Sequence, residues 1–318
     1  MSLRVAIQMD PIGSIHLPSD STFVLALEAQ ARGHELFTYQ PDSLTRRPGG
    51  PLARGRRARA LRREVGNHVD EGELETVDLA AFDVVLIRQD PPFDMGYVTT
   101  THLLELLPAS TLVINDPQGI RDSPEKVLVL RFAEFMPPTL VANHPDDVVA
   151  FQAEFGRVVV KPLYGHGGNG VFLLSEGDPN LEPVLDLLGR TEPVIVQQYV
   201  PSVTEEGDRR IILVEGEPVG AIDRIPKAGD IRSNLVAGGS ARPAVLSDRD
   251  REICRALGPE LRDRGLLLAG IDVIGGQVTE INVTSPTGIP AIERFDGVSV
   301  GALFWDAVSA RRAARAEA

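Results

Sequence analysis

The chain has 318 residues, enough for two or three packed units, because single hydrophobic cores stop growing near about 250 residues. Apolar residues make up 43% and charged residues 24%, a profile typical of a globular protein in water. Acidic residues outnumber basic ones by 45 to 32, and the net charge of -13 argues against general binding to nucleic acid or anionic membranes, which both require a positive surface.

Cysteine content and the first residues bear on the compartment. The single cysteine, Cys254, excludes an intramolecular disulfide and favours a reducing environment. The segment MSLRVAIQMDP reaches a charge and a proline before the apolar core of a signal peptide could form. No run approaches the roughly 18 apolar residues of a membrane-spanning helix. We therefore expect a cytoplasmic protein that does not associate with membranes.

The first third of the chain alternates between buried strands and amphipathic helices. A helix is predicted over residues 20–32, with Asp20 or Ser21 as its N-cap and Gly33 as its stop. This alternation predicts a parallel α/β layer for residues up to about 120. Four apolar runs are typical of buried parallel strands: residues 5–7, 84–87, 112–114 and 158–160.

Residues 46–63 carry eight arginines and almost no large apolar side chain. A patch for binding polyanions is one interpretation of this segment. The acidic run at residues 70–78 follows at once and offsets the positive charge, so a solvated, mobile loop is the favoured interpretation. We assign the segment no function.

A different architecture is predicted after a short helix at residues 145–156. Strands joined by short glycine-containing turns follow, and this pattern is typical of antiparallel sheets. A helix over residues 247–264 has Ser247 as its N-cap, acidic residues in its first turn and Gly265 at its end. Two more strands and a C-terminal helix complete the chain. The first strands of this half are VVVKPL, VFLL, VIVQQYV, RRIILV and PVGAIDRI.

The glycine-rich run at residues 165–170 matches the spacing G-x-G-x-x-G. A dinucleotide-binding loop of this kind requires a helix after it, whereas here a strand follows at residues 171–174, so the glycines cap a β-hairpin. Such a hairpin can lie over phosphates through its backbone N–H groups, and Lys161 on the entering strand could add a positive charge. The sequence favours phosphate contact over a flexible hairpin tip with a surface lysine.

Polar side chains interrupt two apolar strands of a hairpin predicted at residues 270–282. A three-residue turn at 275–277 would place Asp272 opposite Glu280, whereas a two-residue turn would place it opposite Thr279. The first register gathers the apolar residues on one face and the polar ones on the other, as burial of one face demands. We therefore expect Asp272 to face Glu280.

This register predicts a metal site. Two facing carboxylates repel each other unless a cation lies between them. Asp272, Glu280 and Asn282 offer only oxygen ligands from one face, and such a set suits Mg²⁺. A polar strip that faces solvent is the alternative, but it does not explain acidic residues within apolar strands.

The segment at residues 226–243 has no sustained periodicity. Loops of this length within a compact domain are usually functional or disordered. Arg232 and Asn234 lie at its middle, where a closing lid could bring them onto an anion and exclude water. Composition supports a disordered linker equally well.

Motifs from residue 3 to about 310 match one family. The most specific are IRQDPPFD at 87–94 and TEINVTSPT at 279–287. The others are MDPI at 9–12, DSTF at 20–23, R-D-x-x-E-K at 121–126, KPLxGxGG at 161–168, GDxR at 207–210 and RIP at 224–226. With these motifs the chain resembles the prokaryotic glutathione synthetases, which are ATP-grasp ligases.

The resemblance implies a fold and an activity. It implies an α/β protein with an N-terminal parallel α/β domain at residues 1–122, followed by a two-part ATP-grasp fold with antiparallel sheets. The two parts are a small lid subdomain at 123–199 and a C-terminal domain at 200–318. The implied reaction joins γ-L-glutamyl-L-cysteine to glycine through an acyl phosphate and yields glutathione, ADP and phosphate. A homotetramer is also implied.

The resemblance further implies a role for each matching residue. ATP would be bound by Lys126, Lys161, Gly167, Gly168, Gln198, Tyr199, Val200 and Asp208. Two Mg²⁺ ions, with Mn²⁺ as an alternative, would be held by Asp272, Glu280 and Asn282. Arg210 and Arg224 would steady the acyl phosphate, and the substrates would contact Ser14, Arg88, Arg232, Asn234, Ser285 and Thr287.

Two other functions remain open at this point. One is an ATP-grasp ligase for a different acid and amine, against which the motifs of the first domain argue. The other is a nucleotide-binding module without catalysis. Such a module should have lost its charged ligands, whereas Asp272, Glu280 and Lys161 are all present.

Overall fold

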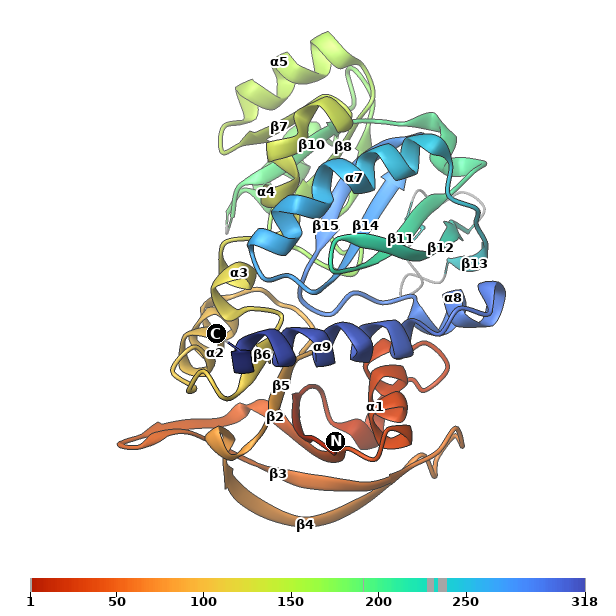
Figure 1. The fold of residues 1–318 in the computed structure, drawn as a ribbon. Coiled ribbons are helices and arrows are strands. Elements are labelled where there is room, and N and C mark those ends of the chain that lie inside the picture. The colour runs from red at the N-terminus through yellow and green to blue at the C-terminus, as the bar shows by residue number, and fades with distance from the viewer. Residues whose placement is uncertain (1, 191, 228–231, 234–238, 318) are drawn as a thin grey trace.

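The computed structural model describes residues 2–190, 192–227, 232–233 and 239–317, and their strands form three sheets (Figure 1). The N-terminal sheet has the strand order β4-β3-β2-β1-β5-β6. Its strands β1, β2, β5 and β6 are parallel, and β3 and β4 are added antiparallel. The apolar runs predict β1, β5 and β6 but not β2. The bounds are β1 Arg4–Gln8, β2 Glu35–Arg47, β3 Gly50–Leu61, β4 Val69–Asp78, β5 Val84–Ile87 and β6 Leu112–Ile114.

The helices of this first part begin at side-chain caps. The predicted helix is α1, Ser21–Ala31, and Asp20 is its N-cap, since the Asp20 carboxylate accepts from the Phe23 N–H at 2.6 Å. The remaining elements are 3₁₀ helices η1 Ile12–Ser14 and η2 Leu79–Ala81, and helices α2 Met95–Leu104 and α3 Pro117–Arg121.

The arginine-rich segment is not a loop, so that prediction is wrong. Its residues form the end of β2 and the whole of β3, and the acidic run that follows is β4, paired with β3. Arg57 Nε on β3 lies 2.8 Å from Glu75 Oε1 on β4. The strand signal is weak because most of its buried positions carry small residues such as Ala53 and Ala58, and Leu61 at its end is the large apolar residue among them.

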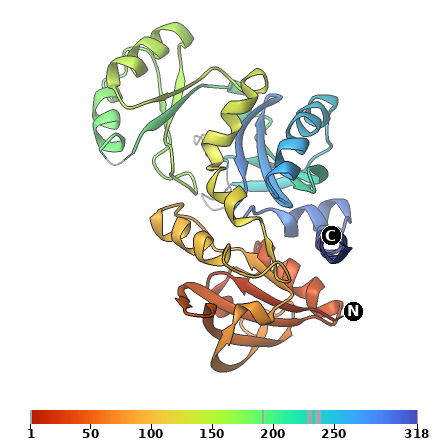
Figure 2. The same ribbon diagram turned by 60° about the vertical axis from the view of Figure 1, so that its left-hand side comes forward.

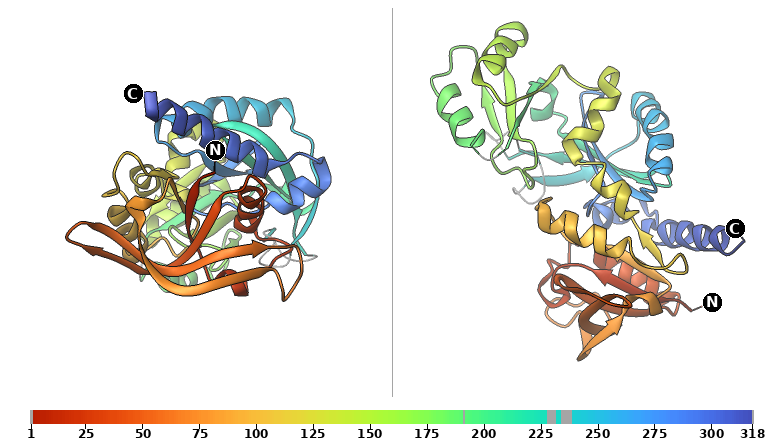
Figure 3. Two further views of the ribbon diagram at one scale, coloured as in Figure 1. Left: turned by 60° about the horizontal axis from the view of Figure 1, so that its bottom comes forward. Right: turned by 90° about the vertical axis from the view of Figure 1, so that its left-hand side faces the viewer.

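The small sheet has the order β7-β10-β8-β9 and is antiparallel throughout. The prediction that residues 158–160 form a parallel strand is therefore wrong, because an apolar run reports burial and not strand direction. This sheet has its own apolar core and forms a separate lobe (Figures 2 and 3). Its elements are β7 Thr139–Ala142, α5 Pro145–Phe155, β8 Val158–Pro162, β9 Phe172–Leu174, α6 Leu181–Leu188 and β10 Val194–Gln198.

The C-terminal sheet has the order β13-β12-β11-β14-β15. Helix α7 packs on it, and Ser247 is its N-cap, as predicted. Ser247 also forms a complete capping box with Asp250. The strands are β11 Asp208–Val214, β12 Glu217–Ile225, β13 Ser240–Pro243, β14 Leu268–Ile274 and β15 Gln277–Asn282. The helices around it are α4 Glu125–Leu128, η3 Val129–Phe135, η4 Pro201–Thr204, α7 Asp248–Asp263, α8 Ile289–Asp296 and α9 Val300–Glu317.

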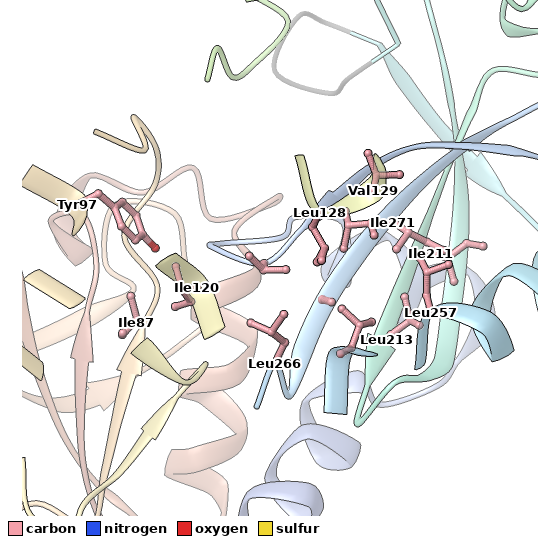
Figure 4. Packing of buried hydrophobic residues seen from close by; sticks show 14 of the residues in the cluster. Ile87, Tyr97, Ile120, Leu128, Val129, Ile211, Leu213, Leu257, Leu266 and Ile271 are labelled. Carbon is pink, nitrogen blue, oxygen red and sulfur yellow. The ribbon is translucent and has the colours of Figure 1, made fainter. Parts of the chain in front are cut away.

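A continuous apolar cluster joins the N-terminal and C-terminal sheets (Figure 4). Leu128 and Val129 of α4 and η3 belong to it and lie near Ile271 of β14. The division of the chain at residues 122 and 199 stays a prediction. The N-terminal part contributes Ile87, Tyr97 and Ile120 to this cluster, and the C-terminal part contributes Leu213, Leu257 and Leu266.

Helix α9 ties the end of the chain to its beginning. Trp305 is fully buried, and its indole N–H donates to the Leu25 carbonyl of α1 at 2.8 Å. Arg312 forms an ion pair with Asp83 at 2.6 Å. None of the described helices combines the length and the apolar composition that a membrane crossing requires.

Replacing Trp305 with alanine should lower the free energy of unfolding by about 3–5 kcal/mol, since it leaves a cavity between α1 and α9. Chemical denaturation measures this change. The matched control is Leu303→Ala on the same helix, where the side chain is 40% exposed. Equal stability of the two variants would show that Trp305 does not fix α9.

Candidate active site

A cavity of about 440 Å³ lies where the three sheets approach one another. It brings together most of the residues predicted from the sequence. They are Lys126, Lys161, Gly167, Gly168, Gln198, Tyr199, Val200, Asp208, Arg210, Arg224, Arg232, Asp272, Glu280, Asn282, Ser285 and Thr287.

Three predicted residues are not among those that line this cavity. Ser14 ends η1 at the surface, and its hydroxyl donates to the Pro11 carbonyl at 3.0 Å. Arg88 is 5% exposed and follows β5. Asn234 lies outside the described residues.

The hairpin of β14 and β15 places Asp272 opposite Glu280, as predicted, but through a different turn. The turn has two residues, Gly275 and Gly276, whose φ values of 56° and 73° are those that a type I′ turn needs. The prediction of a three-residue turn is wrong. A bulge beyond Asp272 adds Thr279 to β15 and restores the register at the two acids.

Two arginines meet the Asp272 carboxylate. Arg210 lies opposite Asp272 across β11 and β14, and its Nε and Nη2 donate to the two carboxylate oxygens at 2.5 and 3.0 Å. Arg224 Nη2 lies 2.9 Å from Oδ2. Burial by itself would raise the pKa of Asp272, but the two guanidinium groups outweigh it and hold the pKa well below its usual range. Asp272 is therefore ionised at neutral pH.

Asp208 completes this charged network. It lies opposite Arg224 across β11 and β12 and accepts a hydrogen bond from its Nη2. Burial raises the pKa of Asp208 to about 6, although Arg224 opposes the shift. Asp208 Oδ1 and Arg224 Nε are buried and have no hydrogen-bond partner among the described residues. Polar atoms in this position call for a ligand, because an unpaired buried polar atom is costly.

Both predicted lysines enter the cavity. Lys126 Nζ donates to the Gly165 carbonyl of the glycine-rich loop. Lys161 Nζ donates to Gln197 at 3.0 Å and lies 3.4 Å from Glu280 Oε1. Burial opposes ionisation of Glu280, but Lys126 and Lys161 outweigh it and lower its pKa. Gly167 and Gly168, with φ of 65° and 77°, give this loop a left-handed backbone that other residues rarely adopt.

The segment after β10 forms another wall of the cavity. The N–H groups of Gln198 and Tyr199 donate to the Pro138 and Arg157 carbonyls, each at 2.9 Å. The Arg157 guanidinium lies 4.4 Å from the centre of the Tyr199 ring. A ligand at this wall must therefore use other groups of the segment than these two N–H donors.

Arg88 connects the N-terminal sheet to the loop that follows β15. Its Nε donates to the Thr22 hydroxyl at 3.0 Å, and its Nη2 donates to the Pro286 carbonyl at 3.3 Å. Asp90 supports the same loop by accepting from the Ser285 hydroxyl at 2.5 Å. These contacts hold in place the loop that carries Ser285 and Thr287 into the cavity.

Comparison with known protein families decides the assignment. A model for the N-terminal domain of prokaryotic glutathione synthetase matches residues 3–121, and one for its ATP-grasp domain matches residues 125–297. The chain belongs to the prokaryotic glutathione synthetase family. It is an ATP-dependent ligase of glutathione biosynthesis, which confirms the resemblance seen in the motifs.

Relatives support membership of the glutathione synthetase family over the full length. A glutathione synthetase of Brucella melitensis is 53% identical over 314 residues, covering 98% of this chain and 100% of the relative. One of Mesorhizobium japonicum is 52% identical with the same coverage.

Solved structures share the fold. D-cycloserine synthetase DcsG has a TM-score of 0.65 at 20% identity, covering 97% of this chain and 99% of its own. D-alanyl-alanine synthetase A of Vibrio cholerae has a TM-score of 0.62 at 14% identity, covering 98% and 99%. The predicted fold class, an α/β domain followed by an ATP-grasp fold with antiparallel sheets, is confirmed.

Glu125 also lines the cavity, although it is not among the site residues predicted from the sequence. It lies beside Lys126 at the start of α4, and its carboxylate accepts from the Thr284 hydroxyl at 3.0 Å. Burial raises the pKa of Glu125 to about 7, and the neighbouring Glu280 adds to the shift. The R-D-x-x-E-K motif contains this residue and was the available signal.

The raised pKa predicts that Glu125→Gln stabilises the ligand-free protein at high pH. The stability that wild type gains from a protonated Glu125 is fully present below about pH 4.5 and is lost as the pH rises through about 7. Glutamine cannot ionise, so the variant should be more stable than wild type by about 1–2 kcal/mol at pH 8, after allowance for solvent screening. Denaturation curves at pH 5 and pH 8 measure the difference. If the stability advantage of Glu125→Gln over wild type became smaller as the pH rises, the raised pKa of Glu125 would be contradicted.

Proposed function

We propose that this ligase joins γ-L-glutamyl-L-cysteine to glycine in the cytoplasm and uses ATP to activate the cysteinyl carboxylate. The proposal is supported mainly by similarity to glutathione synthetases over nearly the whole chain. The facing Asp272 and Glu280, with lysines and arginines around them, provide charges suited to phosphoryl transfer. A homotetramer is proposed from the family resemblance alone.

The residues present fit Mg²⁺. Asp272 and Glu280 face each other in one cavity, and Asn282 Nδ2 points at Asp272 Oδ2 from 3.4 Å, so the amide oxygen is left for a ligand. We propose that these three residues hold two ions, with Mn²⁺ as a substitute. When bound, the metal would neutralise negative charge on the phosphate oxygens of ATP.

The charges of the described cavity residues support two ions. Acidic and basic side chains are equal in number, so they do not offset the charge of ATP⁴⁻, which two divalent cations would balance. The acids are Asp90, Glu125, Asp208, Asp272 and Glu280, and the bases are Lys126, Lys161, Arg210, Arg224 and Arg232.

The chain's own residues then account for the reaction. Lys126 and Lys161 would hold the phosphates of ATP while the cysteinyl carboxylate takes the terminal phosphoryl group and ADP is released. Arg210 and Arg224 would steady the resulting acyl phosphate. The glycine ammonium first loses a proton to solvent, and its nitrogen lone pair then attacks the acyl carbon. The C–N bond forms, the C–O bond to phosphate breaks with phosphate as the leaving group, and the nitrogen loses a second proton to solvent. Arg232 is exposed and lines the cavity, consistent with a covering role.

ATP consumption should require both acyl donor and amine. Phosphate release is measured with ATP and Mg²⁺ while γ-glutamylcysteine and glycine are omitted in turn. Because the carboxylate of γ-glutamylcysteine accepts the phosphoryl group, phosphate release should fall to background when γ-glutamylcysteine is omitted. Unchanged phosphate release without γ-glutamylcysteine would exclude this donor.

Glu280→Gln should lower turnover roughly 10²-fold or more, since it removes one charge at the proposed metal site while keeping the shape of the side chain. Steady-state kinetics with all three substrates measures this loss. Glu205→Gln is the matched control, because Glu205 is exposed and does not line the cavity. Normal turnover of Glu280→Gln would remove this residue from the site.

A further inference from the structure

The Glu125 carboxylate differs from the other acids at the centre of the cavity. Asp272 and Asp208 contact arginines, and Glu280 lies 3.4 Å from Lys161. Glu125 forms no salt bridge within the part of the chain that the structure describes, and its hydrogen-bond partner is the neutral hydroxyl of Thr284. A partly buried carboxylate without a salt-bridge partner is unfavourable, so this position suits a positively charged ligand group.

Glu125 is close to the centre of the proposed reaction. It lines the same cavity as Glu280, Lys126 and Arg210, and Thr284, which donates to it, lies two residues beyond Asn282. An acid in this position therefore faces groups that gather around the reacting carboxylate and not around the far end of the acyl donor.

The proposed substrates offer two ammonium groups. That of γ-glutamylcysteine lies at the opposite end of the dipeptide from the carboxylate that becomes activated. That of the acceptor must come within bonding distance of the same carboxylate carbon. Only the acceptor's ammonium can therefore reach an acid beside the reaction centre in a productive complex.

We propose that Glu125 binds the ammonium group of the acceptor amino acid and places its nitrogen beside the activated carboxylate. The inference rests on the proposed function and adds a substrate-binding role for a residue of α4. A carboxylate here favours acceptors whose amine is protonated in solution, and Thr284 orients it through the 3.0 Å hydrogen bond.

The test compares glycine with hydroxylamine, a small nucleophile that is largely uncharged at neutral pH. With ATP, Mg²⁺ and γ-glutamylcysteine saturating, Glu125→Gln should raise the KM for glycine about tenfold to a hundredfold, through loss of a charge-assisted hydrogen bond. The KM for hydroxylamine, followed by hydroxamate formation, should change little. Glu125→Asp should restore part of the affinity for glycine. The control is Glu134→Gln, because Glu134 is exposed and does not line the cavity.

Two results would overturn the proposal. If Glu125→Gln raised the KM for glycine and the KM for hydroxylamine by the same factor, Glu125 would not recognise the ammonium group. Weaker Mn²⁺ binding by Glu125→Gln in the presence of a non-hydrolysable ATP analogue, measured by electron paramagnetic resonance, would make it a metal ligand instead. Wild-type activity with glycine is measured first, so failure of the proposed function is seen separately from failure of this role.

Discussion

The Asp272 carboxylate, held between Arg210 and Arg224, is the interaction on which the site depends. Strand register brings these groups together: Arg210 of β11 lies opposite Asp272, Asp208 of β11 lies opposite Arg224, and Glu280 of β15 lies on the other side of Asp272. Arg224 reaches Asp272 with its side chain, whose Nη2 lies 2.9 Å from Oδ2. Charges placed this close in a buried region would destabilise the fold unless each met an opposite charge. The C-terminal sheet therefore holds acidic and basic side chains next to one another on neighbouring strands.

The rest of the molecule brings other groups to that sheet. The small sheet supplies Lys161 and the glycine-rich loop, and α4 supplies Glu125 and Lys126. The segment after β5 of the N-terminal sheet supplies Asp90 to the cavity, and Arg88 of the same segment donates to the loop after β15. Four cavity cations, Lys126, Lys161, Arg210 and Arg224, contact acids or carbonyls of the chain. The same cations are those proposed to hold phosphate.

Much of this arrangement could be predicted from sequence where one residue decides a local structure. Asp20 and Ser247 cap their helices because their side chains accept from the first turn. The facing of Asp272 and Glu280 followed from one-sided burial, although the turn was misjudged, because a bulge is not visible in a pattern of period two. Strand β3 and the environment of Glu125 could not be predicted in this way, because both depend on residues distant in the sequence. Strand β3 pairs with β4, where Arg57 meets Glu75, and Glu125 accepts a hydrogen bond from Thr284.

We propose that Asp272, although paired with two arginines, is also a metal ligand. Titration of Mn²⁺ into wild type and Asp272→Asn, each with a non-hydrolysable ATP analogue, tests it most directly. We expect the variant to lose a bound ion or to bind it at least tenfold more weakly, because a ligand charge is gone. Equal stoichiometry and affinity in the two proteins would show that Asp272 serves only to hold Arg210 and Arg224.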